Sequence, residues 1–102
     1  MALKVFITGA SSGIGAALAR HNAANGATLA LTARRGAVLE ELKSGIGTGP
    51  GAGANIEIYS ADVTDAASMA RAANAFIERH GAPDVVIACA GVSIGEIGRA
   101  HV

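Results

Sequence analysis

The chain has 102 residues and a formal net charge of zero, with 51% hydrophobic and 16% charged residues. A chain of this length forms one small domain at most, and its composition is that of a chain with a large buried core. A disordered tail and a basic arm that binds nucleic acid are therefore excluded. The only aromatic residues are Phe6, Tyr59 and Phe76, which are too few to stack a run of bases.

Short apolar runs alternate along the chain with alanine-rich segments of helical spacing. In chain order we expect a strand at 3–7, a helix at 13–25, a strand at 28–33, a helix at 36–43, a strand at 55–60, a helix at 65–80 and a strand at 84–90. Nearly continuous apolar strands are typical of a sheet covered on both faces. This alternation predicts an α/β domain with a parallel sheet, most simply in the strand order 3-2-1-4, with helices on both faces.

Several residues mark the ends and faces of these helices. Gly26 and Gly81 follow the first and third helices, where a left-handed cap is wanted, and Thr64 or Asp65 can cap the start of the third helix. Helical spacing predicts one apolar face on each of these two helices, formed by Ile14 and Leu18 on the first and by Met69, Ala73, Phe76 and Ile77 on the third.

The segment "SGIGTGPGAGAN", Ser44 to Asn55, is a loop by its glycine and proline content. It contains "GTGPGA", which nominally fits the pattern G-x-G-x-x-A. No predicted strand leads into this pattern and no predicted helix leaves it. We therefore interpret it as a flexible loop and not as a second phosphate site.

The stretch "TGASSGIG", Thr8 to Gly15, stands between a predicted strand and a predicted helix. Gly9 allows a sharp turn off the strand, and Gly13 and Gly15 remove side chains where the backbone must approach a pyrophosphate. The unpaired N–H groups at the start of the helix point toward such an anion. The alternative is that the glycines and serines here only form a tight turn.

This octapeptide resembles, without a mismatch, the T-G-x-x-x-G-x-G signature of the short-chain dehydrogenase/reductase family. The resemblance extends through "ADV", Ala61 to Val63, and "ACAG", Ala88 to Gly91, and so covers nearly the whole chain. It implies a partial Rossmann-like, doubly wound parallel sheet of about four strands. Residues 1–102 would then be the N-terminal NADP-binding portion of such a domain, with the C-terminal catalytic part absent.

The resemblance also implies roles for individual residues. It assigns the pyrophosphate region to Gly9, Ser11, Ser12, Gly13, Ile14 and Gly15, the adenine to Asp62 and Val63, and the ribose to Ala90 and Gly91. The alternative for Asp62 is that it caps or closes the turn into the next helix. Cys89 stands where the family has an asparagine, and we expect it to be a buried small hydrophobe more than a reactive thiol.

Cofactor selectivity should depend on "LTARR" at the end of the second strand. NAD-binding relatives have an acidic residue where this chain has Ala33. An arginine can pair with a 2′-phosphate that a carboxylate would repel, so we expect NADP over NAD, with Arg34 the stronger contact and Arg35 the weaker one. The alternative is that the two arginines only solvate the strand end.

No catalytic residue can be assigned. The family uses a Y-x-x-x-K motif and a serine after the fifth strand, whereas four residues beyond Tyr59, the single tyrosine, stands Val63. Ser93 follows the fourth strand instead. Each of the three histidines, His21, His80 and His101, is better explained by a surface or helix-end role.

The run Val85 to Ala90 would form an apolar strand at the exposed edge of the sheet.

Two functions remain open from the sequence. One is an NADP-dependent oxidoreductase that transfers hydride between the nicotinamide and a carbonyl or alcohol, present here as its cofactor-binding half. The other is a non-catalytic nucleotide-binding module, or a truncated gene product without turnover. The single cysteine and the short apolar run at the N-terminus lead us to expect a cytoplasmic protein with no metal site, no nucleic-acid partner and no membrane partner. A homo-oligomer is compatible with the family.

Overall fold

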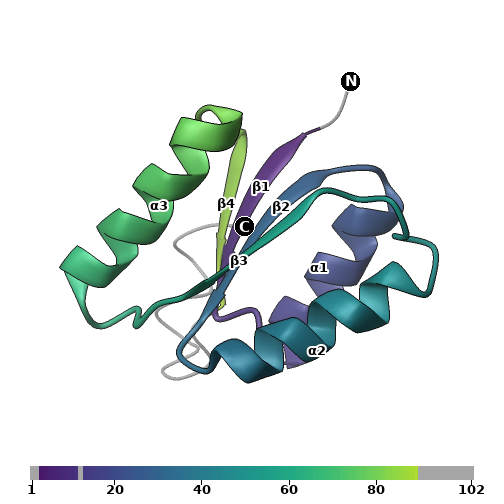
Figure 1. Ribbon diagram of the computed structural model, residues 1–102, viewed down its shortest axis with the longest axis horizontal. Coiled ribbons are helices and arrows are strands. Elements are labelled where there is room, and N and C mark those ends of the chain that lie inside the picture. The colour runs from purple at the N-terminus through teal and green to yellow at the C-terminus, as the bar shows by residue number, and fades with distance from the viewer. Residues whose placement is uncertain (1–2, 12, 90–102) are drawn as a thin grey trace.

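The computed structural model describes residues 3–11 and 13–89. Strands and helices alternate along the chain (Figure 1). The elements are β1 (Lys4–Thr8), α1 (Gly13–Ala24), β2 (Thr28–Ala33), α2 (Gly36–Gly47), β3 (Ile56–Ser60), α3 (Ala66–His80) and β4 (Val85–Ala88).

The four strands form one parallel sheet in the order β3-β2-β1-β4, as the sequence predicts. Their carboxyl ends are in register, because Thr8 of β1 pairs with Thr32 of β2 and with Ala88 of β4. Figure 1 shows α1 and α2 on one face of the sheet and α3 on the other. The predicted doubly wound arrangement is therefore confirmed.

The larger core lies between the sheet and the α1–α2 pair. Side chains alternate along each strand, so Val5 and Ile7 of β1 face this core while Phe6 faces the opposite side. From α2, Leu39, Leu42 and Ile46 enter the same core. From α1 the buried residues are small, Gly15, Ala19 and Ala23, which lets this helix approach the sheet closely.

A smaller core lies under α3. Phe76 is fully buried and meets Phe6 edge to face, with ring centroids 6.0 Å apart and an interplanar angle of 74°. Ala30, Ala61 and Ala72 complete the buried part of this cluster. Of the predicted α3 face, Met69 and Ala73 pack against the cluster, but Ile77 is 42% exposed.

Two expectations about helices are wrong. The helix α2 does not end near residue 43 but continues to Gly47, four residues into the segment that its composition predicts to be a loop. Ile46 is buried on the same face of α2 as Leu39 and Leu42. Its burial outweighs the low helix propensity of the neighbouring glycines. On α1, Ile14 is 65% exposed and only Leu18 of the predicted pair packs on the core.

The helix ends follow the sequence signals. Gly26 and Gly81 have positive φ angles of 82° and 87°, in the region that favours glycine. Asp65, one of two predicted caps, is the N-cap of α3, and its carboxylate accepts hydrogen bonds from Ala67 N at 3.0 Å and Ser68 N at 3.3 Å. The start and end of α3 are therefore fixed locally.

Among the described residues, β4 is an edge strand of the sheet. Val86 at its centre is 53% exposed, as expected for an apolar strand at an edge. An apolar groove of about 460 Å³ lies beside it, between β4, β1 and α3, and includes Phe6, Val63 and Met69. Over the described part of the chain, no helix has the length and apolar character to cross a membrane.

Candidate functional site

Those residues singled out from the sequence that the structure describes lie at one end of the sheet, where the parallel strands have their carboxyl ends. Backbone hydrogen bonds continue past the strands here: Ala10 N donates to Thr32 O at 2.9 Å, Ala61 N to Ala33 O at 2.9 Å, and Cys89 N to Thr8 O at 3.0 Å. The residues that directly follow β1, β3 and β4 are thus tied to their neighbouring strands. Three segments far apart in the sequence become one surface.

The turn between β1 and α1 has the geometry that its glycines predict. Gly9 has a φ of 67°, so the chain turns through the left-handed region directly after β1. A Cβ atom added at Gly13 would meet no protein atom within 4 Å, so protein packing does not require a glycine there. The first turn of α1 has no acidic residue. This turn can therefore receive a close-lying anionic group.

The other residues predicted at this turn differ in exposure. Ser11 is exposed and Gly15 is buried against the core side of α1. Ile14 projects outward from the helix. Ser12 lies outside the described residues, as do Ala90 and Gly91 after β4.

Two arginines directly follow β2. The Arg34 side chain is 73% exposed, and its carbonyl oxygen accepts a hydrogen bond of 2.8 Å from the Ser60 hydroxyl. Arg35 is exposed and occupies the N-cap position of α2 in an extended conformation, without a side-chain cap. Ala33, the last residue of β2, is 4% exposed. Arg34 and Arg35 thus place positive charge beside the N-terminus of α2, which itself favours anions.

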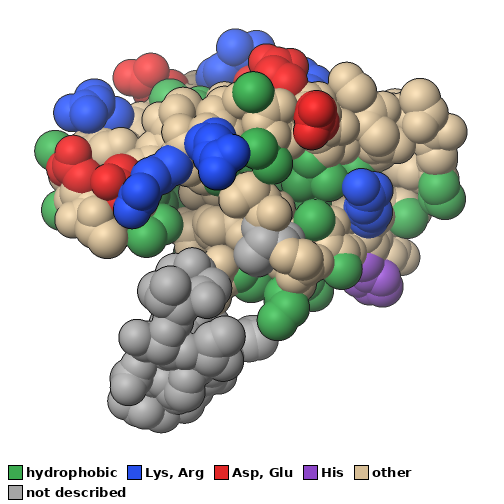
Figure 2. Space-filling view, turned by 90° about the horizontal axis from the view of Figure 1, so that it is seen from below, with side chains coloured by type: hydrophobic (Ala, Val, Ile, Leu, Met, Phe, Trp, Pro, Cys, Tyr) green, Lys and Arg blue, Asp and Glu red, His purple; other side chains and the backbone are tan. Residues whose placement is uncertain are grey.

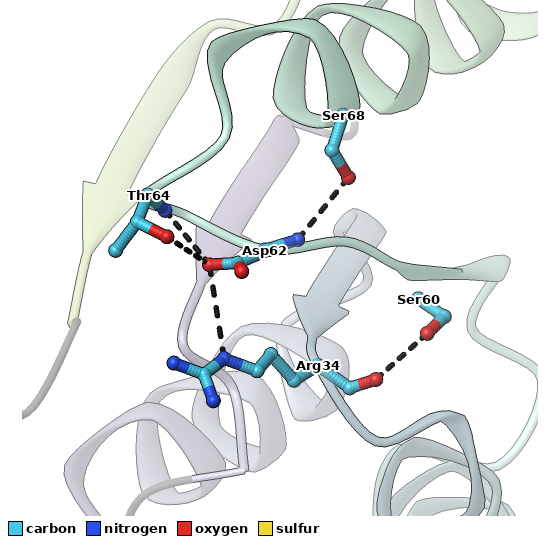
Figure 3. A network of polar contacts seen from close by, with 5 residues as sticks. All are labelled: Arg34, Ser60, Asp62, Thr64 and Ser68. Atoms are coloured by element: carbon cyan, nitrogen blue, oxygen red, sulfur yellow. Dashed lines mark hydrogen bonds and ion pairs between the residues drawn. The ribbon is translucent and has the colours of Figure 1, made fainter.

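Asp62 lies in the loop between β3 and α3, at the centre of a polar network (Figure 3). Its Oδ1 accepts hydrogen bonds from Thr64 N at 2.9 Å and from Thr64 Oγ1 at 2.7 Å, and lies 3.7 Å from Arg34 Nε. These Thr64 hydrogen bonds, and more weakly the Arg34 charge, lower the pKa of the Asp62 carboxyl. Asp62 therefore closes its own turn and is ionised at neutral pH, while Val63 beside it is 42% exposed.

Cys89 follows β4 and is only partly buried, where the sequence led us to expect a buried residue. Burial still raises the pKa of its thiol, so the thiolate is disfavoured at neutral pH. The backbone N–H of Cys89 remains bonded to Thr8 O. The expectation that this residue is not a reactive thiol agrees with this environment.

Tyr59 and His80 lie where α3 packs against β3. The Tyr59 hydroxyl is buried without a hydrogen-bond partner among the described residues, and burial, followed by the Glu57 charge, raises its pKa. His80 is the last residue of α3, with its Nε2 2.9 Å from Glu57 Oε2 and its ring 5.0 Å from that of Phe76. Its contacts are those of a structural helix-end residue, as predicted.

Figure 2 looks onto the end of the molecule where the strands have their carboxyl ends, and it shows basic and acidic side chains interspersed on this face. The whole chain is also electrically neutral. Selectivity for a charged ligand must therefore come from particular side chains and not from an overall potential. Within residues 3–11 and 13–89, no cluster of three or more His, Cys, Asp or Glu side chains could hold a metal ion.

Comparison with known proteins agrees with this geometry. The family model described as short chain dehydrogenase matches residues 3–101. Glycine betaine reductase of Emericella nidulans is 43% identical over 84% of this chain, and 3-dehydrosphinganine reductase of Arabidopsis thaliana is 42% identical over 85% of it. An alcohol dehydrogenase of the archaeon Thermococcus sibiricus, solved with 5-hydroxy-NADP, superposes with a TM-score of 0.77 at 36% identity over 84% of this chain.

A parallel sheet in the order 3-2-1-4 with a glycine turn after its first strand defines a Rossmann-like α/β fold of the nucleotide-binding type. The chain belongs to the short-chain dehydrogenase family. It spans 6% and 25% of the length of the two curated relatives and 36% of the archaeal structure.

Sequence reasoning did not identify two residues that shape the site. The sequence indicates Thr64 only as a possible helix cap, although its hydroxyl and backbone N–H hold Asp62. It does not indicate Ser60, whose hydroxyl holds the Arg34 backbone. The signal for Thr64 is present in "DVT", since an aspartate two residues before a threonine is typical of a turn closed by the aspartate side chain. No local signal could identify Ser60, because its partner lies 26 residues away.

Proposed function

We propose that this chain forms the part of an NADP(H)-dependent short-chain dehydrogenase that binds the adenosine and pyrophosphate of the cofactor. The observation that carries the proposal is the position of Arg34. It follows β2 directly, and Ala10 of the glycine turn is bonded to the end of the same strand. A dinucleotide whose pyrophosphate lies at the turn would thus bring its adenosine ribose toward Arg34.

In this proposal the glycine turn receives the pyrophosphate. The residues concerned are Gly9, Ser11, Ser12, Gly13, Ile14 and Gly15, of which all but Ser12 are described by the structure. The positive φ of Gly9 and the open space at Gly13 support this role. The helix N-terminus adds N–H donors and a favourable dipole.

Arg34 would pair with the 2′-phosphate of NADP(H), and Arg35 would contribute less. Asp62 and Val63 would lie at the adenine, and Ala90 and Gly91 at the ribose. The absence of a carboxylate at Ala33 removes the repulsion that a 2′-phosphate would meet there. The archaeal relative was solved with an NADP derivative, which supports the same cofactor class.

For the whole protein we propose an oxidoreductase. A bound nicotinamide supplies hydride transfer to or from a carbonyl or alcohol. The contribution of the described residues would be to bind the cofactor's adenosine end and to set its selectivity. The partly buried, raised-pKa groups Tyr59 and Cys89 take no part in this scheme.

Isothermal titration calorimetry of the 102-residue chain with NADPH and NADH tests the proposal. We expect NADPH to bind about tenfold more tightly, because a charge-assisted contact to a phosphate contributes about 1.5–3 kcal/mol and Arg34 is largely exposed, which favours the lower end. Arg34→Gln should remove this preference and leave NADH binding unchanged. Arg35→Gln is the matched control with a smaller effect. Equal affinities for the two cofactors in the unmodified chain would contradict the proposal.

A further inference from the structure

Arg34 is held at both of its ends by the loop and strand that neighbour it. At its backbone, the Ser60 hydroxyl donates to Arg34 O at 2.8 Å, directly beside the bond from Ala61 N to Ala33 O. At its side chain, Nε lies 3.7 Å from Asp62 Oδ1 (Figure 3). The arginine therefore leaves the end of β2 in a direction that β3 and its following loop define.

Asp62 is held in place by contacts other than its contact with Arg34. Both Thr64 donors reach the same oxygen, Oδ1, that faces Arg34 Nε. The Asp62 backbone N–H also donates to Ser68 Oγ at 3.2 Å, which ties the loop to the first turn of α3. Figure 3 shows the carboxylate between Thr64 on one side and the guanidinium on the other. The anion is thus placed by its own turn, and its lowered pKa keeps it charged.

The contact with Asp62 engages only one part of the guanidinium. Within the described ranges, the side chain of Arg34 pairs only with Asp62, and it does so through Nε. A guanidinium carries five N–H donors in a planar fork, so the two terminal nitrogens keep their donors for a second anion. A carboxylate on one side of an arginine and a phosphate on the other is an arrangement that this geometry permits.

We propose that Asp62, fixed by Thr64, is a positioning residue that holds the Arg34 guanidinium ready for the 2′-phosphate of NADP(H). The inference rests on the proposed function, and adds that cofactor preference depends on the Asp62–Thr64 pair as well as on Arg34. Holding a long side chain before binding reduces the ordering that binding must impose. Because the Asp62–Arg34 pair is exposed and 3.7 Å long, we expect a modest effect, about threefold in affinity.

Two other roles for Asp62 make different predictions. If Asp62 only contacted the adenine, its loss would weaken NADPH and NADH binding by the same factor. If its charge mainly repelled the 2′-phosphate, neutralising it would strengthen NADPH binding. A positioning role predicts an additional loss that is confined to ligands carrying the 2′-phosphate.

The test uses Asp62→Asn and Thr64→Val in the 102-residue chain, with circular dichroism to verify folding. The Asn side chain keeps an oxygen for Thr64 and removes the charge that faces Arg34, whereas Thr64→Val removes one donor and leaves Asp62 intact. Thr64→Ser is the matched control, because it keeps the hydroxyl. Calorimetry compares adenosine 2′,5′-bisphosphate with adenosine 5′-monophosphate, and NADPH with NADH.

We expect Thr64→Val to weaken the 2′-phosphorylated ligands about threefold, with the other two ligands changed less than 1.5-fold. Asp62→Asn should weaken the 2′-phosphorylated ligands about threefold more than the other two, because the adenine contact of Asp62 is common to all four ligands. Thr64→Ser should behave as the unmodified chain, and Asp62→Asn should have no further effect on this preference in an Arg34→Gln background. Equal losses for both ligand classes, no change, or tighter NADPH binding would overturn the inference alone. A lack of any NADPH preference in the unmodified chain would overturn the proposed function and this inference together.

Discussion

A substitution at Gly51 tests how the segment after α2 packs against α1. It lies in the segment that follows α2 and is buried against α1 and the end of α2. A Cβ added at Gly51 would lie 2.7 Å from Ala23 Cβ, 2.7 Å from Ile46 Cγ2 and 3.3 Å from the Ala23 carbonyl carbon. The segment therefore packs against α1 near the C-terminal end of that helix, whose N-terminus forms the candidate pyrophosphate site. This packing requires a glycine at position 51.

The magnitude for Gly51→Ala follows from these distances. Carbon atoms in favourable contact are about 3.5–4.0 Å apart, so the new methyl group requires a displacement of about 1 Å. Ile46 can rotate, but the Ala23 methyl is fixed to its helix backbone, so α1 or the segment must move. Overpacking of this kind costs about 1–3 kcal/mol, and the lower entropy of the unfolded alanine chain offsets about 0.4–1 kcal/mol. The middles of these two ranges, about 2 and about 0.7 kcal/mol, give an expected net destabilisation of about 1.3 kcal/mol.

Gly47→Ala is the matched control, because it makes the same chemical change at the end of α2 where a Cβ meets nothing within 4 Å. We expect this variant to be more stable than the unmodified chain by about 0.5–1 kcal/mol. Urea denaturation followed by far-UV circular dichroism measures both free energies of unfolding, with equal m-values as the condition for comparison. A Gly51→Ala variant as stable as the unmodified chain would refute the packing argument.

Two further predictions concern the loop before α3. Asp65→Ala removes the carboxylate that accepts hydrogen bonds from Ala67 N and Ser68 N, and should lower the free energy of unfolding by about 1 kcal/mol. Asp65→Ser, which keeps a capping oxygen, should retain most of the stability of the unmodified chain. Urea denaturation measures the free energy of unfolding of both variants. The lowered pKa of Asp62 means that its contacts stabilise the fold above the ordinary carboxyl range, and that this contribution is lost as the pH falls through the depressed value. Thr64→Val should raise the pKa of Asp62 back toward its ordinary value of 3.8, because it removes the hydroxyl that donates to the carboxylate. NMR titration of the Asp62 carboxyl carbon measures this pKa. An unchanged titration would show that the Thr64 hydroxyl does not hold the carboxylate.

Much of the candidate site could be predicted because its signals are local. The turn at Gly9 and the cap at Asp65 depend on residues within a few positions along the chain. Predictions failed where burial against a distant element decided the outcome. Ile14 is exposed because the small residues Gly15, Ala19 and Ala23 form the face of α1 that packs on the sheet.

The sequence by itself determined the alternation of strands and helices, the parallel sheet, the glycine turn and the family, since these depend on periodicity and on short motifs. Only the tertiary structure decided that α2 continues to Gly47, because the burial of Ile46 compensates for glycines that favour a loop. Only the tertiary structure brought Asp62 and Thr64 to Arg34. The two segments lie about thirty residues apart, and the register of β2 with β3 places their ends side by side.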